Sequence, residues 1–186
     1  MATSGSTDFE LDVNDYIEEA FERCGLEVRT GYDVRTATRS LNLMFADWAN
    51  RGLNRWTIEQ STLSLTSGTA TYSLPADTID ILSAVIRTGT GSTQSDTQIT
   101  RISRDAFINI PSKNTEAQPS QWYVDRQIAP TIKVWPTPNT SYTLVYDRLT
   151  RIEDADSSIN TLDVPFRFYP CLAAGLAYYL AMKKAP

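Results

Sequence analysis

The chain has 186 residues, of which 41% are hydrophobic and 21% are charged, with a formal net charge of -5 and no histidine. This length and composition are typical of one soluble globular domain, or of one core with an inserted unit. Without histidine the chain can form no Ser/His/Asp triad, no Cys/His pair and no histidine-ligated metal site. The acidic balance also argues against a surface that binds nucleic acid electrostatically as a whole.

The two cysteines, Cys24 and Cys171, lie far apart in apolar, helix-like surroundings. We interpret them as buried structural thiols of a reducing compartment; a disulfide or a reactive thiol is the alternative. The polar N-terminus lacks the basic and apolar regions of a signal peptide. The longest apolar stretch, residues 168–182, is shorter than the roughly 20 residues that span a bilayer. We therefore expect a protein made and used without export, with no membrane partner.

Hydrophobic periodicity predicts two helices near the N-terminus. Residues 13–24 place apolar side chains at helical spacing, with Asp12 as the N-cap. Residues 34–48 carry a second apolar stripe, with Asp33 as the N-cap. Because the connection is short, the two helices should form an antiparallel hairpin.

The middle of the chain differs in composition, since 18 of the 44 residues from 57 to 100 are Ser or Thr. This favours strands and turns over helix. The pair Ser67-Gly68 predicts a hairpin between strands at 62–65 and 69–74. Five further strands are expected at 79–87, 98–102, 121–125, 131–135 and 142–149, with a loop at 88–97 and a short helix at 104–109 capped by Ser103. The connections are too short for parallel crossovers, so about seven short antiparallel strands are predicted.

A final helix is predicted to begin near Pro165, after an acidic loop at 153–163. One side of this helix is apolar, and its other faces carry small residues that let another helix approach closely. The fold class is therefore expected to be α+β. A helical bundle would be made of an N-terminal hairpin (1–56) and the C-terminal helix (151–186), and an antiparallel β unit would be inserted at 57–150.

The carboxylates give no catalytic constellation. Glu18 and Glu22 lie one helical turn apart, as do Asp15 and Glu19, and both pairs are interpreted as a solvated helix face. The acidic run at 153–158 lacks the ligand spacing of a calcium loop. The sequence contains neither a complete dinucleotide fingerprint nor a P-loop. The chain is therefore predicted not to be an enzyme, with no catalytic residue, cofactor or metal site.

Aromatic side chains of the β unit allow one alternative function. Trp122, Tyr123, Trp135, Tyr142 and Tyr146 could stack against a sugar or a single-stranded nucleic acid, although alternating core residues are the simpler interpretation. The alternative function is a module that binds carbohydrate or a host surface.

Charge is distributed unevenly along the two N-terminal helices. Residues 8–27 hold eight acidic side chains and one arginine, whereas residues 29–55 hold five arginines and two aspartates. The two helices are therefore electrostatic complements, either within one subunit or across an interface between subunits. The candidate subunit or partner contacts are Glu18, Glu22, Arg35, Arg39, Tyr178, Lys183 and Lys184.

Six short segments follow one another along the chain in a distinctive order. They are WANRG at 48–52, YSLPAD at 72–77, TRISRD at 100–105, PSQWYVD at 119–125, WPTP at 135–138 and VPFRF at 164–168. In order and spacing they resemble the head-tail adaptor proteins of short-tailed bacteriophages, also called connector, tail tubular protein A-like or head-completion proteins. The resemblance extends from Val13 to the end of the chain.

The resemblance implies a structural virion protein at the head-tail connector. Proteins of this family form a ring of twelve copies beneath the portal protein, extend the DNA channel and bind the tail nozzle, a tail tubular protein B-like partner. Genomic DNA would pass through without sequence-specific binding. The protein would be assembled in the host cytoplasm, and residues 1–11 and 88–97 would become ordered on docking.

Overall fold

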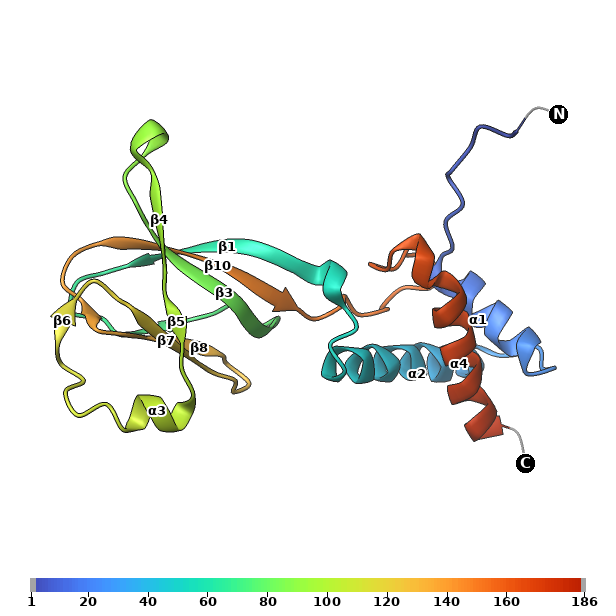
Figure 1. The fold of residues 1–186 in the computed structure, drawn as a ribbon. Coiled ribbons are helices and arrows are strands. Elements are labelled where there is room, and N and C mark those ends of the chain that lie inside the picture. Colours follow the sequence, from blue (N-terminus) through green and yellow to red (C-terminus); the bar gives the residue numbers. More distant parts are fainter. Residues whose placement is uncertain (1–2, 185–186) are drawn as a thin grey trace. The chain divides into compact units, whose positions relative to one another are not determined.

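A computed structural model describes residues 3–184, and the chain divides into two compact units (Figure 1). The helical unit comprises Met1–Trp56 and Ile152–Pro186, and the β unit comprises Thr57–Arg151. The expected α+β class is confirmed by this content of helices and strands. The expected ranges also take in residues 1–2 and 185–186, which lie outside the described residues.

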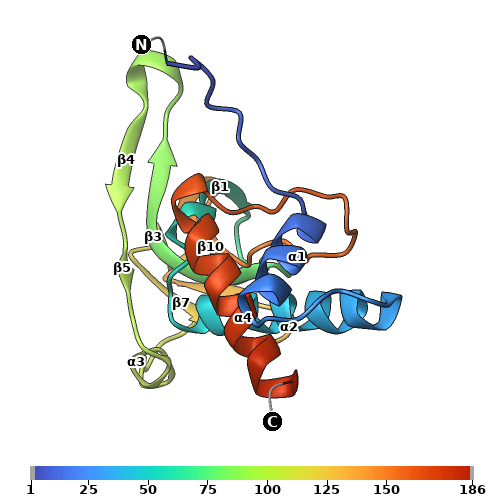
Figure 2. The ribbon, with the colours of Figure 1, turned by 90° about the vertical axis from the view of Figure 1, so that its right-hand side faces the viewer.

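Three helices build the helical unit: α1 (Val13–Arg23), α2 (Gly31–Asn50) and α4 (Tyr169–Lys184), the last preceded by a 3-10 turn at Phe166–Phe168. Helix α4 packs against both α1 and α2 (Figure 2). Each helix buries one apolar stripe in a shared core, as amphipathic helices do. The largest fully buried side chains there are Tyr16, Ile17, Phe21, Leu41, Met44 and Leu172.

The caps of the first two helices follow from their flanking residues. Asp12 caps α1 as predicted, in a reciprocal capping box with Asp15. The prediction of Asp33 as the cap of α2 is wrong, because the extended Thr30 takes that position. The Thr30 hydroxyl accepts from the Asp33 N–H, and the Asp33 carboxylate accepts from the Thr30 N–H. Helix α2 thus begins at Gly31, three residues before the predicted apolar stripe.

Both cysteines are free, and they differ in exposure. Cys24 is half-buried, and its thiol donates to the carbonyl oxygen of Ala177 at 3.3 Å. Cys171 is exposed, so the prediction of two buried thiols is wrong at this position. The reason is helical phase, since the neighbouring Leu172 and Ala173 take the buried face of α4.

Two four-stranded sheets form most of the β unit. The first is antiparallel throughout, in the order β1 (Ile58–Leu65), β10 (Tyr142–Thr150), β3 (Thr78–Thr88) and β4 (Ser95–Gln98). The second has the order β2 (Thr71–Ser73), β8 (Thr131–Trp135), β7 (Gln121–Asp125) and β5 (Thr100–Arg101). A short pair of β6 (Glu116–Ala117) and β9 (Thr137–Pro138) and the helix α3 (Arg104–Ile108) complete the unit.

One apolar core serves both sheets. Alternate residues of β7 and β8 are buried, as expected for strands with one face on a core. The largest fully buried side chains of this core are those of Trp122, Leu65, Ile81, Ile86, Ile132 and Leu144. The core therefore contains side chains from both four-stranded sheets.

Three details of the predicted strand pattern are wrong. The Ser67-Gly68 turn joins no hairpin, because β1 pairs with β10 and β2 pairs with β8. Strands β5 and β7, and likewise β6 and β9, pair in parallel, which the antiparallel prediction excluded. The expected loop at 88–97 is shorter, because β4 continues the ladder with β3 from Ser95 onward. The described residues form ten strands, where about seven were predicted.

Candidate functional site

Among residues 3–184, no cluster of three or more Cys, Asp or Glu side chains is placed to hold a metal ion. Within the same residues, no helix has both the length and the apolar character needed to cross a bilayer. The candidate functional features are cavities and exposed surfaces of the two units.

One cavity lined by several arginines lies in the β unit and has a volume of about 600 Å³. Arg101, Arg104 and Arg126 line it. Two of these arginines bind one carboxylate, since Arg101 and Arg126 pair with Asp80 at 2.9 and 2.6 Å. Asp80 thus offsets one of these two positive charges, and Asp125 also lines the cavity, which weakens it as an anion site.

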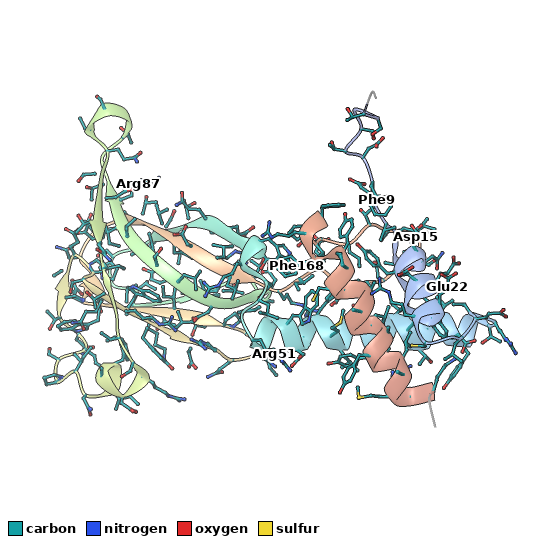
Figure 3. All side chains as sticks on the ribbon, turned by 45° about the vertical axis from the view of Figure 1, so that its right-hand side comes forward. Phe9, Asp15, Glu22, Arg51, Arg87 and Phe168 are labelled. Carbon is teal, nitrogen blue, oxygen red and sulfur yellow. The ribbon has the colours of Figure 1, made fainter. Side chains whose placement is uncertain are left out.

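A groove with acidic residues runs along α1 and the first turn of α4, with a volume of about 420 Å³. Glu18 and Glu22 are exposed on it, one helical turn apart as predicted. Figure 3 shows Asp15 and Glu22 along α1, with Phe9 on the segment that precedes the helix. Phe9 and Tyr169 contribute apolar lining. We call this feature the acidic groove.

Exposed aromatic side chains adjoin the acidic groove. Phe9 is 62% exposed and Phe166 is 67% exposed. Their rings meet edge to face, with centroids 6.4 Å apart, and Phe166 meets Tyr169 in the same way at 5.4 Å. Aromatic rings at this exposure are unusual on a surface that contacts only water. Sequence patterns did not single out this pair, because Phe9 and Phe166 come from opposite ends of the chain.

Helix α2 exposes a stripe that contains two arginines. Tyr32, Arg35, Arg39 and Leu43 are all exposed, and their spacing of three to four residues places them on one side of the helix. The buried residues of α2, among them Leu41, lie on the opposite side. We call these four residues the arginine stripe, and its position confirms that Arg35 and Arg39 share an exposed face.

The complementary charges of α1 and α2 do not meet within one copy of the chain. Among residues 3–184 no ion pair joins the two helices. Within α1, Arg23 pairs with Glu19 at 2.7 Å. Arg51, which directly follows α2, pairs with Asp47 at 3.0 Å. Of the two arrangements predicted from the sequence, pairing within one subunit is therefore not observed.

The two lysines at the end of α4 are engaged by α2. The Lys183 ammonium donates to the Ser40 hydroxyl at 2.6 Å. The Lys184 ammonium binds the Asp33 carboxylate and lies 4.8 Å from the centre of the Phe21 ring. The hydrogen bond from Lys184, with that from Thr30, lowers the pKa of Asp33 to about 2. A role of these lysines in partner contacts stays a prediction, and within the subunit they join α4 to α2.

Tyr178, the remaining candidate contact, is 64% exposed on α4. Its ring touches that of Tyr179 edge to face at 6.2 Å. It lies near the exposed Met182, one turn further along the same helix. Its use as a contact residue also stays a prediction.

The aromatic residues considered for sugar stacking lie mostly in the core. Trp122 is 1% exposed, and its indole N–H donates to the carbonyl oxygen of Ile99 at 3.2 Å. Tyr146 is 4% exposed. Trp135 is half-buried and donates to the carbonyl oxygen of Ser112 at 2.9 Å. Tyr142 packs against the same core, whereas Tyr123 and Trp135 are half-buried outside it. The interpretation as core residues therefore holds for three of the five.

A long hairpin of β3 and β4 extends from the β unit (Figure 1). One rung before the end of its ladder, Arg87 binds Asp96 through two hydrogen bonds of 2.8 Å. Mutual hydrogen bonding raises the pKa of Arg87 and lowers that of Asp96. At the tip, Gly89 has a φ of +74°, and a Cβ there would lie 2.3 Å from the Thr93 carbonyl oxygen. The hairpin therefore depends on a fixed ion pair and one obligatory glycine.

Arg148 organises one end of the first sheet, which no sequence motif indicated. Its guanidinium binds the carboxylates of Glu59 and Asp77, the latter at 2.7 Å, and the Thr78 hydroxyl at 3.0 Å. Glu59 lies directly opposite Arg148 in the ladder of β1 and β10. Only the register of two strands distant in sequence reveals this network.

Comparison with known proteins gives one family. The family model described as SU10 adaptor protein matches residues 9–186. Among solved structures, the chain is similar to one from the neck of an empty GTA particle, with 12% identity, 96% of this chain and 85% of that chain covered, and a TM-score of 0.31. No curated protein matches significantly.

Proposed function

Because the chain belongs to the SU10 adaptor protein family, we propose that it is a head-tail adaptor, a structural component of a phage virion. The family match confirms the resemblance to head-tail adaptor proteins that the six sequence segments carry. In this role several copies, twelve by the family resemblance, form a ring between the portal protein and the tail nozzle. The ring would extend the channel through which genomic DNA passes.

The family match over residues 9–186 is the observation that carries the proposal. It covers nearly all of both units, so the proposal concerns the whole chain rather than a single motif. The surfaces described above are compatible with an assembly role: the acidic groove, the arginine stripe and the β3–β4 hairpin each present exposed side chains. A protein that works through repeated contacts needs such surfaces and needs no catalytic centre.

The proposed partners are further copies of this chain, the portal protein and a nozzle protein. Contact with DNA would be non-specific, because a channel wall must let every sequence pass. The acidic residues of α1 would disfavour tight binding of phosphate groups near them. The proposed location is the virion neck after assembly in the host cytoplasm, and no catalytic activity is expected.

The test combines the full chain with the portal protein from the same genome. Native mass spectrometry should show a complex of fixed stoichiometry, and electron microscopy should show added density on the tail-facing side of the portal ring. Failure to form a stoichiometric complex with assembled portal would contradict the proposal. A monomeric free chain would not, since the portal can act as the template for the ring.

Binding of carbohydrate, the alternative from the sequence, gains no support from the aromatic residues. Trp122 and Tyr146 are part of the core, so substituting them would disrupt the β unit whether or not sugars bind. Trp135→Ala is the more informative variant, because Trp135 is half-buried. Binding to host polysaccharide that Trp135→Ala abolishes without unfolding the chain would revive this alternative.

A further inference from the structure

We propose that the acidic groove of one copy binds the arginine stripe of α2 in a neighbouring copy. This inference rests on the proposed ring assembly and names the surfaces that form its repeated contact. The occupant of the groove is thus a second copy of the same chain. This contact is supported by the charges of the two surfaces, the spacing of those charges, the apolar side chains nearby and the direction in which the two helix faces point.

The charged pairs match in sign and spacing. Glu18 and Glu22 are exposed and four residues apart on α1, and Arg35 and Arg39 are exposed and four residues apart on α2. Four residues correspond to about 6 Å along a helix axis. Two helices lying side by side can therefore bring both carboxylates opposite both guanidinium groups at once. Neither arginine has an ion-pair partner among the described residues.

Apolar side chains flank both charged pairs. Tyr32 and Leu43, 68% and 55% exposed, lie on either side of the arginines. The groove offers Phe9 and Tyr169 beside the glutamates. Burying such side chains supplies favourable free energy, while the charges determine register and exclude wrong partners. Both surfaces therefore combine charged with apolar side chains, and Glu18 and Glu22 are opposite in charge to Arg35 and Arg39.

The two faces cannot satisfy each other within one copy. The buried residues of α1, such as Ile17, and of α2, such as Leu41, lie on the sides of their helices opposite the exposed charges. Both charged faces consequently point away from the shared core. Each copy presents one groove and one stripe, which gives a heterologous contact that can repeat around a ring.

The test uses two charge-reversed variants of the full chain. One carries Glu18→Lys and Glu22→Lys, and the other carries Arg35→Glu and Arg39→Glu. Each alone places like charges at the contact, so self-association measured by sedimentation at about 50 mM salt should weaken about tenfold or more. The wild-type chain should lose association in the same way when salt is raised to about 500 mM.

Mixing the two variants is the decisive step. In the mixture, the reversed groove of one variant meets the reversed stripe of the other, and the unreversed surfaces also match. Association should return to the wild-type level in the equimolar mixture, and in one chain carrying all four substitutions. The control variant carries Asp105→Lys and Glu116→Lys, at two exposed positions of the β unit. It changes the net charge as much as Glu18→Lys with Glu22→Lys does, and it should leave association unchanged.

Either of two results would overturn the inference. The first is variants that associate as the wild-type chain does, either free at low salt or, where the free wild-type chain is monomeric, as a ring on assembled portal. The second is lost association that mixing fails to restore, which would assign the groove to another basic partner. Binding of the wild-type chain to assembled portal is measured in parallel. Normal portal binding with either result rejects this contact alone, whereas absent portal binding rejects the adaptor role.

Discussion

Gly175 in α4 faces Met44 in α2 so closely that a Cβ at position 175 would lie 2.5 Å from the Met44 sulfur. Met44 is 1% exposed, so its side chain would have to shift within the core to make room for a Cβ. The small-residue segment of α4 predicted a close helix approach, and this contact identifies the residue that permits it. Gly175 therefore acts by its lack of a side chain.

Gly175→Ala should destabilise the helical unit by about 1 kcal/mol or more. In an open helix position the same change would stabilise by about 1 kcal/mol through helix propensity. Here overpacking against Met44 reverses the sign. Urea unfolding of the full chain, followed by circular dichroism, gives the change in free energy.

A double-mutant cycle assigns the effect of Gly175→Ala to Met44. In a Met44→Ala background, which is itself destabilised by a cavity, adding Gly175→Ala should be neutral or favourable. An equal cost in both backgrounds would mean that the clash with Met44 is not the cause.

Tyr16→Phe should stabilise the helical unit by about 1 kcal/mol. Tyr16 is fully buried, and its hydroxyl has no hydrogen-bond partner among the described residues. Burial of an unsatisfied polar group carries a cost that the phenylalanine removes. Burial is also the main cause of the raised pKa of Tyr16. Tyr169→Phe, at the half-buried ring that meets Tyr16 edge to face, is the control and should change the unfolding midpoint little.

Helices were predictable here because their signals are local. The stripes around Ile17 and Leu41 each lie within one segment, so periodicity alone identified the buried face. Strand pairing was not predictable, because β1 pairs with β10 across most of the β unit. At Gly68 a real turn exists, but its N–H donates to the Pro138 carbonyl oxygen at 2.9 Å, and the chain passes from one sheet to the other.

The candidate surface residues were predictable only as exposed charges. Glu18 and Arg39 are exposed, as the helical phase requires. Sequence reasoning could not find the contact of Lys184 with Asp33, because it depends on how α4 crosses α2. The same holds for the contact of Phe166 with Phe9, which joins the turn before α4 to the segment before α1.

Asp33→Asn should reduce the acid sensitivity of the helical unit. The Lys184 ammonium, followed by the Thr30 hydroxyl, lowers the pKa of Asp33 from 3.8 to about 2. A carboxyl with a lowered pKa contributes stability that is present above its unfolded value and is lost as pH falls through the folded value. The wild-type chain should therefore lose stability between about pH 4 and pH 2, and the variant should lose less over that range.

Removal of the donor tests the cause of this pH dependence. Lys184→Ala should flatten the same part of the profile of unfolding midpoint against pH, since it deletes the main partner of Asp33. Profiles of both variants that parallel the wild type would show that Asp33 does not titrate in this range.

Arg148→Ala should destabilise the β unit by about 2 kcal/mol, because it leaves Glu59, Asp77 and Thr78 without their shared donor. The Arg148 side chain is only 11% exposed, so water replaces it poorly. Arg87→Ala removes a more exposed pair with Asp96 and should destabilise the β unit clearly less. Hydrogen exchange of β1 and β10 measures the first effect, and equal losses for the two variants would contradict this ranking.

Gly89→Ala should loosen the tip of the β3–β4 hairpin while leaving the rest of the β unit intact. A left-handed φ of +74° and a Cβ only 2.3 Å from the Thr93 carbonyl oxygen both oppose any side chain at this position. Gly91→Ala is the matched control, because φ there is +57° but the space around a Cβ is open. Since the tip is exposed, the global unfolding midpoint should change little. Peptide-resolved hydrogen exchange should instead show faster exchange at residues 88–95 in Gly89→Ala than in Gly91→Ala, and equal rates would mean that backbone conformation alone sets the requirement for glycine.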